Sequence, residues 1–319
     1  MNHSNHLRSL ALKIRGKIPE RTLGKTGLKI PILSMGGESV VKIPNKETEA
    51  IELLQTAYKM GVRYFDTAPE YHPSELRVGK ALEGVRKNVI IATKTHDRTK
   101  SGSWHLLEKS LQNLKTDYID IWQLHHVDHD DEVRTIFGPD GAISAMKEAK
   151  AQGLVKYLGI TGHYDPRPLL TAIRQFDFDT ILLAINAADT HKYSFMKKLI
   201  PEAVNKNIGI IGMKVCSRGR LFDPTGLNNM KDAMDYVYTL PVTTAIIGHD
   251  NTKQLVENAK IAQDFKPLSR TQMNELEEKT KRYSEFGLYF RKGYERFNPF
   301  WEPYGYEKEK RKEGCSGLS

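Results

Sequence analysis

Eight short apolar runs recur along the chain between residues 30 and 265, and helical segments separate them. Each run is apolar at most positions and rich in β-branched or aromatic residues, which is typical of a strand buried on both faces of a parallel sheet. The runs cover residues 32–35, 62–65, 89–92, 118–122, 155–160, 180–184, 208–211 and 244–247. Eight strands that alternate with helices over about 240 residues fit the size of a (β/α)8 barrel, the TIM barrel.

Helical patterns lie between these runs. Residues 47–60 repeat apolar side chains at helical spacing and are followed by Gly61, which can end a helix. Residues 103–114 carry leucines on one side, and residues 251–263 begin at Asn251 or Thr252, either of which can cap a helix. The alternative fold is a doubly wound sheet that binds a dinucleotide, but residues 35–39 lack the G-x-G-x-x-G pattern that usually follows its first strand. An α/β fold of the barrel type is therefore predicted.

Three parts of the chain can be separated. Residues 1–18 are polar and basic and are interpreted as a flexible tail, whereas residues 19–268 form the barrel. Within the barrel part, residues 21–30 resemble a hairpin that would plug the N-terminal end of the strands. Residues 269–319 are a helix, expected over 269–283, followed by an extension of the same domain that is rich in aromatic residues. These aromatic side chains either pack on the outer helices or cover the barrel mouth and shape a substrate pocket.

Composition excludes several classes of protein. The formal charge is +9, from 48 Lys and Arg against 39 Asp and Glu, but the cations are interleaved with acids along the chain. The densest run, 307–313, alternates in sign and indicates a solvated tail rather than a nucleic-acid patch. No stretch approaches the roughly 20 apolar residues of a membrane-spanning helix, and two cysteines cannot make a disulfide framework. We expect a cytoplasmic protein with a small-molecule substrate and no nucleic-acid or membrane partner, and its oligomeric state stays open.

Ionisable residues end three consecutive predicted strands. Asp66 ends the second run, Lys94 the third, and His125 with His126 the fourth, while Tyr71 lies on the loop after the second. Active sites of (β/α)8 enzymes are built at this end of the strands. Buried charges are costly unless they are paired, so an ion pair between Asp66 and Lys94 is expected. Convergence of these side chains on one opening predicts a catalytic site.

The same segments strongly resemble the aldo-keto reductases. The resemblance is carried by Phe-Asp-Thr-Ala-Pro-Glu-Tyr at 65–71, by Ala-Thr-Lys at 92–94 and by the run at 117–125, with further matches at 153–160, 247–248 and 254–258. It covers about residues 20–265 in the order and spacing of the family. The resemblance implies a barrel that binds NADP(H), or less often NAD(H), in extended form. It also implies a catalytic tetrad of Asp66, Tyr71, Lys94 and His125.

Physical chemistry supports the roles that the resemblance implies. Carbonyl reduction needs a hydride, which the nicotinamide supplies, and a proton for the developing alkoxide. A free tyrosine has a pKa of about 10, and a neighbouring ammonium such as Lys94 would lower the pKa of Tyr71. Asp66 would keep Lys94 charged and fixed, and His125 would donate a hydrogen bond to the carbonyl oxygen.

The cofactor residues depart from the family pattern in places. His163 stands where an amide side chain usually holds the carboxamide, Asn186 replaces the usual Gln, and Met213 replaces the tyrosine that stacks on the nicotinamide ring. Lys214, Ser217 and Arg218 are expected to cradle the pyrophosphate. The residues expected to bind the cofactor are Gly36, Gly37, Asp66, His163, Asn186, Met213, Lys214, Ser217, Arg218, Gly219, Leu221, Gly248, His249, Lys253, Gln254, Glu257 and Asn258. NADP is favoured over NAD because Lys253 can meet a 2′-phosphate, although Asp250 opposes this and Gln254 stands where many relatives have Arg.

The predicted function is that of a reductase that reduces an aldehyde or ketone to an alcohol, or runs in reverse, and two other functions are alternatives. A regulatory or redox-sensing subunit, resembling the potassium-channel β subunits, need not keep the whole tetrad. A lyase that uses Lys94 as a Schiff base leaves the motif at 254–258 unexplained. No metal site is expected, because adjacent residues His125 and His126 on a strand should point to opposite sides. Residues 127–137 are interpreted as a polar loop beside the pocket, and Cys216 as a packed small side chain.

Overall fold

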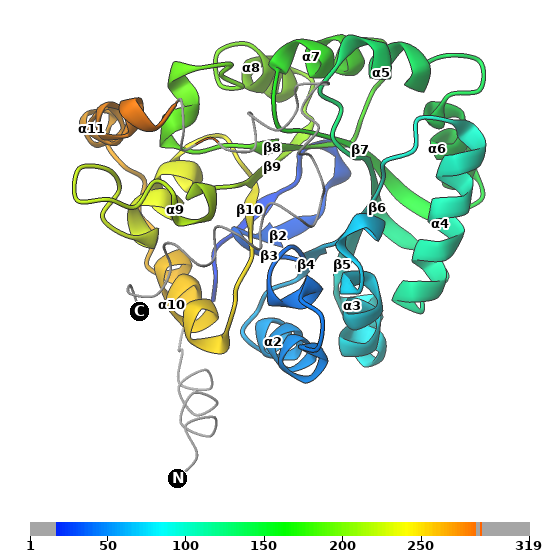
Figure 1. Ribbon diagram of the computed structural model, residues 1–319, viewed down its shortest axis with the longest axis horizontal. Coiled ribbons are helices and arrows are strands. Elements are labelled where there is room, and N and C mark those ends of the chain that lie inside the picture. Colours follow the sequence, from blue (N-terminus) through cyan, green and yellow to red (C-terminus); the bar gives the residue numbers. More distant parts are fainter. Residues whose placement is uncertain (1–16, 285–287, 289–319) are drawn as a thin grey trace.

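Eight parallel strands close into a barrel, and helices surround it (Figure 1). The structure is a computed structural model that describes residues 17–284 and Leu288. Around the barrel the strand order is β10-β3-β4-β5-β6-β7-β8-β9. The strands are β3 (Leu33–Gly36), β4 (Tyr64–Asp66), β5 (Ile90–Thr95), β6 (Ile119–Leu124), β7 (Val155–Gly162), β8 (Thr180–Ala184), β9 (Gly209–Met213) and β10 (Thr244–Ile247). The predicted (β/α)8 fold is confirmed, because each predicted apolar run overlaps one of these strands.

The α-helices follow the strands as the sequence pattern predicts. They are α2 (Glu47–Lys59), α3 (Ser74–Leu82), α4 (Lys100–Leu114), α5 (Asp130–Ile136), α6 (Ala142–Ala151), α7 (Pro166–Gln175), α8 (Leu199–Asn205), α9 (Met230–Thr239), α10 (Thr252–Gln263) and α11 (Arg270–Thr280). Asn251 caps α10 as predicted, because its side chain accepts a hydrogen bond from the Gln254 amide. Helix α4 begins earlier than predicted, since Thr99 caps it through the amide of Gly102.

Short 3-10 turns complete the described chain. They cover Gly24–Thr26, Val40–Lys42, Pro69–Tyr71, Glu83–Asn88, Ala187–His191, Ser217–Gly219 and Lys281–Ser284. Strands β3, β4, β6, β8 and β9 are buried at every position, which explains why their sequences are nearly continuous apolar runs instead of alternating ones. In the part of the chain that the structure describes, no helix has both the length and the apolar character to cross a membrane.

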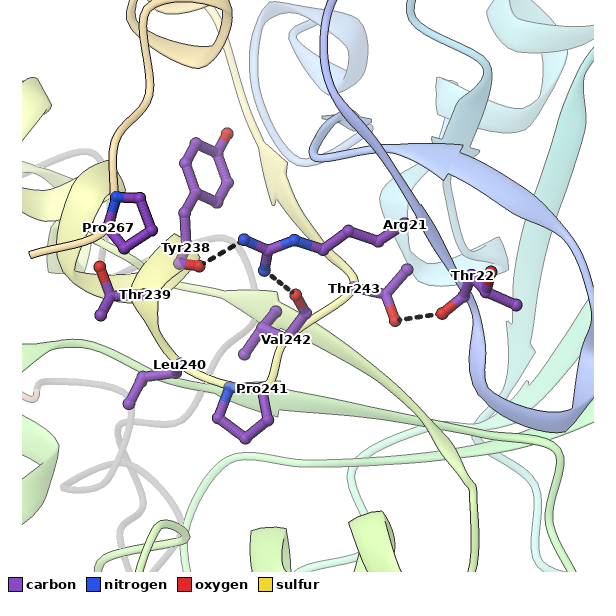
Figure 2. A pocket seen from close by; sticks show the side chains of 9 residues that line it. All are labelled: Arg21, Thr22, Tyr238, Thr239, Leu240, Pro241, Val242, Thr243 and Pro267. Atoms are coloured by element: carbon purple, nitrogen blue, oxygen red, sulfur yellow. Dashed lines mark hydrogen bonds between the residues drawn. The ribbon is translucent and has the colours of Figure 1, made fainter.

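An antiparallel hairpin covers the N-terminal end of the barrel, as predicted. It pairs β1 (Glu20–Thr22) with β2 (Lys29–Pro31), and the amide of Lys25 donates to the carbonyl of Asn207, just before β9. The Arg21 guanidinium donates to the carbonyls of Tyr238 and Val242, at 2.7 and 2.6 Å, just before β10 (Figure 2). The pocket drawn in Figure 2 therefore lies at the attachment of the hairpin, at the opposite end of the barrel from the ionisable residues.

Three boundaries differ from the prediction. Residues 127–137 are not a polar loop, because they contain α5, whose Val133 and Ile136 are buried and whose Glu132 accepts hydrogen bonds from the amides of Asp128 and His129. Ile18, the last residue of the predicted tail, is buried. Met273 and Leu276 of α11 are also buried and join the hydrophobic core, so the core extends past residue 268. The aromatic residues of the segment 286–306 lie outside the described residues.

Candidate active site

Asp66, Lys94 and Tyr71 lie together at the C-terminal ends of β4 and β5. Lys94 Nζ donates to Asp66 Oδ2 at 2.5 Å and to the Thr67 carbonyl at 2.6 Å. Asp66 Oδ1 accepts from Gln123 Nε2 of β6 at 3.2 Å. Burial raises the pKa of Asp66, and the attraction of Lys94 and these hydrogen bonds oppose the rise. The predicted ion pair is therefore present, and both of its members are buried.

Tyr71 and His125 face each other above this pair. Tyr71 ends the turn Pro69–Tyr71, and its Oη lies 3.3 Å from His125 Nε2. The two rings meet edge to face with centroids 5.7 Å apart, and Lys94 Nζ lies 5.0 Å from the centre of the Tyr71 ring. The fold thus brings the four residues of the predicted tetrad together, with Lys94 linking Asp66 to the Tyr71 ring.

His125 and His126 lie on the same side of the chain, so the expectation that they point apart is wrong. Strand β6 ends at Leu124, and His126 has a φ of 55°, in the left-handed region, which breaks the alternation of a strand. The rings of His125 and His126 have centroids 3.8 Å apart, and His126 stacks on His163 at 4.5 Å. Arg98 holds this bend by donating to the carbonyls of both His125 and His126. Burial lowers the pKa of all three histidines well below 6.5, so each ring is neutral near pH 7.

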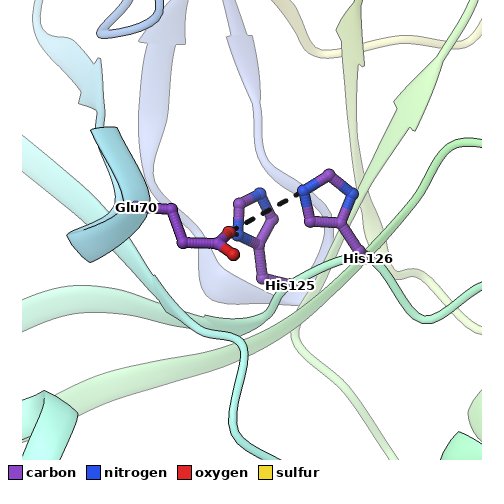
Figure 3. A group of neighbouring side chains, drawn as sticks. All are labelled: Glu70, His125 and His126. Atoms are coloured by element: carbon purple, nitrogen blue, oxygen red, sulfur yellow. Dashed lines mark ion pairs between the residues drawn. The ribbon is translucent and has the colours of Figure 1, made fainter. Parts of the chain in front are cut away.

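Glu70 lies in the candidate site, and sequence reasoning missed it. Its Oε2 lies 2.6 Å from His125 Nδ1 and 3.9 Å from His126 Nε2, and the carboxylate faces both rings (Figure 3). Its Oε1 lies 3.7 Å from His96 Nδ1. The only signal in the sequence is its place directly before Tyr71, in the motif at 65–71.

Asp128 was also missed. Its Oδ1 accepts hydrogen bonds from the amides of His163 and Tyr164, at 2.7 and 3.0 Å. Its Oδ2 is buried and has no hydrogen-bond partner among the described residues. Burial raises the pKa of Asp128 to about 6. Asp128 therefore positions His163 through its backbone.

On the opposite side of the mouth, two cations predicted to bind the pyrophosphate, Lys214 and Arg218, are paired with the carboxylate of Glu38. Lys214 Nζ and an Arg218 guanidinium nitrogen lie 2.7 and 2.5 Å from the two oxygens of Glu38, which follows β3, and Lys42 lies 3.2 Å from it. Burial alone would raise the pKa of Glu38, but these cations hold it well below its ordinary range. Sequence reasoning missed Glu38, because no local pattern links it to Arg218, 180 positions away.

The other predicted cofactor residues surround this cluster. Ser217, Arg218 and Gly219 have φ values of 51°, 55° and 81°, so the chain turns sharply after β9. A Cβ on Gly37 would lie 2.6 Å from Ser74 Oγ and 2.7 Å from the Asp66 carbonyl, so only glycine fits there. Asn186 differs from the prediction in that its side chain already bonds the Lys214 carbonyl and the Ala188 amide. Gln254 Oε1 accepts from the Asp250 amide.

Some of the residues predicted to bind the cofactor are buried, and others are exposed. Met213, Leu221, His249 and Asn258 are buried, and Gly36 packs its backbone against Gly248. Lys253 and Glu257 are exposed on α10, with Gln254 half-buried between them. Cys216 is half-buried against the core, and burial raises the pKa of its thiol, in agreement with a packing role.

Comparison with known proteins identifies the family of the chain. The model of the aldo/keto reductase family matches residues 33–235, or 203 of the 319 positions. The uncharacterized oxidoreductase YqkF of Bacillus subtilis is 31% identical over 184 residues, which are 53% of this chain and 57% of that protein. L-galactose dehydrogenase of Arabidopsis thaliana is 31% identical over 160 residues, 46% of this chain and 49% of that enzyme. The chain thus spans about half the length of these two relatives.

Further matches extend over more of the chain. D-threo-aldose 1-dehydrogenase of a Pseudomonas species is 26% identical over 242 residues, 63% of this chain and 70% of that enzyme. The holo form of the aldo-keto reductase AKR11C1 of Bacillus halodurans superimposes with a TM-score of 0.70 at 23% identity, covering 82% of this chain and 96% of the other. At that identity the superposition supports the barrel fold alone.

Proposed function

The chain belongs to the aldo/keto reductase family, and from that premise we propose that it is an NADP(H)-dependent oxidoreductase that interconverts an aldehyde or ketone with an alcohol. The observation that carries this proposal is the position of Tyr71, whose hydroxyl lies 3.3 Å from His125 Nε2 and whose ring centre lies 5.0 Å from Nζ of the buried, paired Lys94. Tyr71 would act as the general acid in reduction and as the general base in oxidation.

Each of the four residues has a separate task in this proposal. The cofactor, when bound, supplies or accepts the hydride. Tyr71 gives its proton to the developing alkoxide, and the Lys94 ammonium stabilises the phenolate that this leaves. Asp66 neutralises Lys94 in a site where an unpaired ammonium would be costly. His125 directs its Nε2 toward the same oxygen, where it orients the carbonyl group.

The anion-binding side fits a phosphorylated cofactor. Lys42, Lys214 and Arg218 surround the single carboxylate of Glu38, which leaves a net charge of +2 there, from three cations and one anion. The turn after β9 also brings backbone amides to this edge of the barrel, with the positive φ values that such turns need. These residues would hold the pyrophosphate. Lys253 on α10 favours NADP over NAD, because it is exposed near the start of the helix, where a 2′-phosphate would be met.

A second candidate is an aldose dehydrogenase, in which the same site runs toward oxidation. Two relatives carry the names L-galactose dehydrogenase and D-threo-aldose 1-dehydrogenase. In this chain the groups beside Tyr71 are polar: the Glu70 carboxylate and the His96 ring are both partly exposed. Such groups can bond the hydroxyls of a sugar. A regulatory subunit is the less favoured alternative, because a sensor has no need for the complete tetrad.

Steady-state kinetics test both candidates. The chain is mixed with NADPH and a panel of aldehydes, ketones and quinones, and separately with NADP and a panel of aldoses. Turnover on carbonyl compounds supports the reductase, and turnover on aldoses supports the dehydrogenase. Tight cofactor binding without turnover on any of these substrates would instead support the regulatory alternative. Fluorescence titration with NADPH and NADH decides the cofactor, and tighter NADH binding would overturn the preference for NADP.

A further inference from the structure

We propose that Glu70, His125 and His126 form a binding site for a divalent transition metal ion, with Zn²⁺ as the probe. One ligand atom from each of these side chains lies within 4.8 Å of the others. The carboxylate comes from the turn after β4, and the two imidazoles come from the bend after β6 (Figure 3). This binding site shares His125 with the proposed tetrad, but metal binding itself does not depend on hydride transfer.

The distances suit one ion held between the three groups. Glu70 Oε2 lies 2.6 Å from His125 Nδ1 and 3.9 Å from His126 Nε2. Zinc bonds to nitrogen and oxygen of about 2.0–2.2 Å in a tetrahedron place neighbouring ligand atoms about 3.4 Å apart. The observed separations lie on either side of that value. A rotation of the partly exposed Glu70 side chain can lengthen its short distance to His125 Nδ1 and shorten its longer distance to His126 Nε2.

His125 Nδ1 is one of the buried polar atoms near the site that make no hydrogen bond among the described residues. The His125 side chain is 1% exposed, and its Nδ1 has no hydrogen-bond partner among the described residues. Glu70 Oε2 is close to it but does not meet the geometry of a hydrogen bond. A buried polar atom left without a partner costs about 1–3 kcal/mol. An ion at the position between Nδ1 and the carboxylate would use both groups.

The donor set also has the right chemistry. Imidazole nitrogens and a carboxylate oxygen are the ligands of many zinc sites, and three protein ligands leave a fourth position open for water. Each imidazole has a ring nitrogen that can donate a lone pair to a metal ion, and the Glu70 carboxylate can balance part of the charge of the ion.

Metal binding would have a consequence for His125. An ion on Nδ1 leaves the single ring proton on Nε2, the nitrogen that lies 3.3 Å from Tyr71 Oη. In that tautomer Nε2 is a donor, which is the form that can hydrogen-bond a carbonyl oxygen. Without the ion, a Glu70 carboxylate next to Nδ1 favours the opposite tautomer. The site would therefore connect metal occupancy to the donor state of His125.

A second group shares His126 and is the rival position for the ion. It consists of His126, Asp128 and His163, whose ligand atoms also lie within 4.8 Å of one another. Asp128 Oδ1 already accepts two backbone amides, and that carboxylate is fixed by them. The first group is favoured because the Glu70 carboxylate already lies 2.6 Å from a nitrogen of one ring and 3.9 Å from a nitrogen of the other. Asp128→Asn keeps the amide acceptor and separates the two positions.

The test is a titration of the full chain with ZnCl₂ after treatment with a chelator, followed by calorimetry. Co²⁺ is then added as a spectroscopic probe, because its visible absorption reports tetrahedral coordination. The variants are Glu70→Gln, His126→Gln and Asp128→Asn, and the matched control is His105→Gln, which alters an exposed histidine on α4. Thermal melting of each variant checks that it is folded. Nitrogen-15 NMR of the histidine rings identifies which ring nitrogen holds the metal.

We expect one strong equivalent of Zn²⁺ in the original chain, in His105→Gln and in Asp128→Asn. Glu70→Gln and His126→Gln should bind at least about tenfold more weakly, since loss of even a supporting partner of a metal ligand costs 10–100-fold. Equal binding in folded Glu70→Gln, or a loss in Asp128→Asn alone, would overturn the assignment. No cofactor or substrate is present in this titration, so its failure leaves the proposed reductase untouched, and absence of turnover leaves the metal site untouched.

Discussion

The charged side chains on the two sides of the barrel mouth are paired in different ways. On the side of β4, β5 and β6, Lys94 and Asp66 are buried together and already lie as the proposed chemistry requires. On the side of β3 and β9, Lys214 and Arg218 are bound to Glu38, in the place where a phosphate is expected. The comparison indicates that the proton-transfer groups are pre-organised, whereas the anion-binding cations must exchange one partner for another.

Exposure explains why this exchange can occur. The side chains of Lys94 and Asp66 are each 2% exposed, so breaking that pair would leave an unpaired charge in the core. The Glu38 side chain is 26% exposed and that of Arg218 is 35% exposed, so water can replace either partner. We call the side with Asp66 and Lys94 the rigid half of the mouth, and the side with Glu38, Lys214 and Arg218 the adjustable half.

Replacement of Lys94 by Met should have the largest effect, because it breaks the rigid half. It leaves the Asp66 carboxylate buried and unpaired, and removal of one partner of a buried pair typically costs about 3–5 kcal/mol. Urea denaturation should show this loss, and turnover should fall about 100-fold or more as Tyr71 loses its neighbouring charge. The double variant Lys94→Met with Asp66→Asn should recover much of the stability and none of the activity. Recovery of both would contradict the role of Lys94.

Tyr71→Phe should affect turnover alone. The ring and its packing stay, but the group placed to protonate the alkoxide is removed, so kcat should fall at least about 100-fold. Fluorescence titration should show nearly unchanged cofactor binding. Tyr118→Phe, which alters a tyrosine just before β6 at the other end of the barrel, serves as the control and should keep normal turnover. Near-normal kcat in Tyr71→Phe would remove Tyr71 from its role.

Much of the rigid half could be predicted from the sequence. The strands are buried on both faces, so their apolar runs are visible, and the residues that end them must meet at one edge of a closed barrel. The pair of Asp66 and Lys94 follows from the cost of burying either charge alone. These inferences need only the order of the strands and the chemistry of single residues.

The rest depends on contacts that no local pattern encodes. Glu38 meets Arg218 across the barrel mouth, and only the closed fold brings β3 and β9 near each other. The left-handed backbone of His126 is an uncommon conformation for a residue that is not glycine, so the alternation of a strand failed at that point. In α5 the acidic first turn, Asp130 to Glu132, concealed a helix whose apolar positions, Val133 and Ile136, are few.

His249, one of the residues predicted to bind the cofactor, should make the free energy of unfolding depend on pH. It is 1% exposed, and burial lowers its pKa to about 4, against an ordinary value of 6.5. The unfolded chain binds this proton at a higher pH than the folded chain does, so the stability is full above pH 6.5 and is lost as the pH falls toward 4. The loss should reach about 1.4 kcal/mol per pH unit and about 3 kcal/mol in all. Urea denaturation from pH 7 to pH 4.5 measures it.

The contribution of His249 is isolated by difference. His249→Asn removes the titrating ring, so the gap in stability between the original chain and this variant should change with pH in that window. His105→Asn, which alters an exposed histidine, should follow the pH profile of the original chain. Parallel profiles for the original chain and His249→Asn would show that the ring of His249 titrates as freely when folded as when unfolded.

The smallest expected effect is on cofactor affinity, and it tests whether Lys214 and Arg218 exchange Glu38 for a phosphate group. In Glu38→Gln, Lys214 and Arg218 keep a polar neighbour but lose the carboxylate that competes with an incoming phosphate. Phosphate binding then breaks no ion pair, and the repulsion between Glu38 and the anion disappears. The Kd for NADPH should therefore fall about three- to tenfold, which corresponds to about 0.7–1.4 kcal/mol. Glu108→Gln removes the same charge from an exposed site on α4 and should leave the Kd nearly unchanged, which excludes an effect of net charge alone. Weaker binding in Glu38→Gln would instead mean that the carboxylate positions the cations for the phosphate, and that both halves of the mouth are pre-organised.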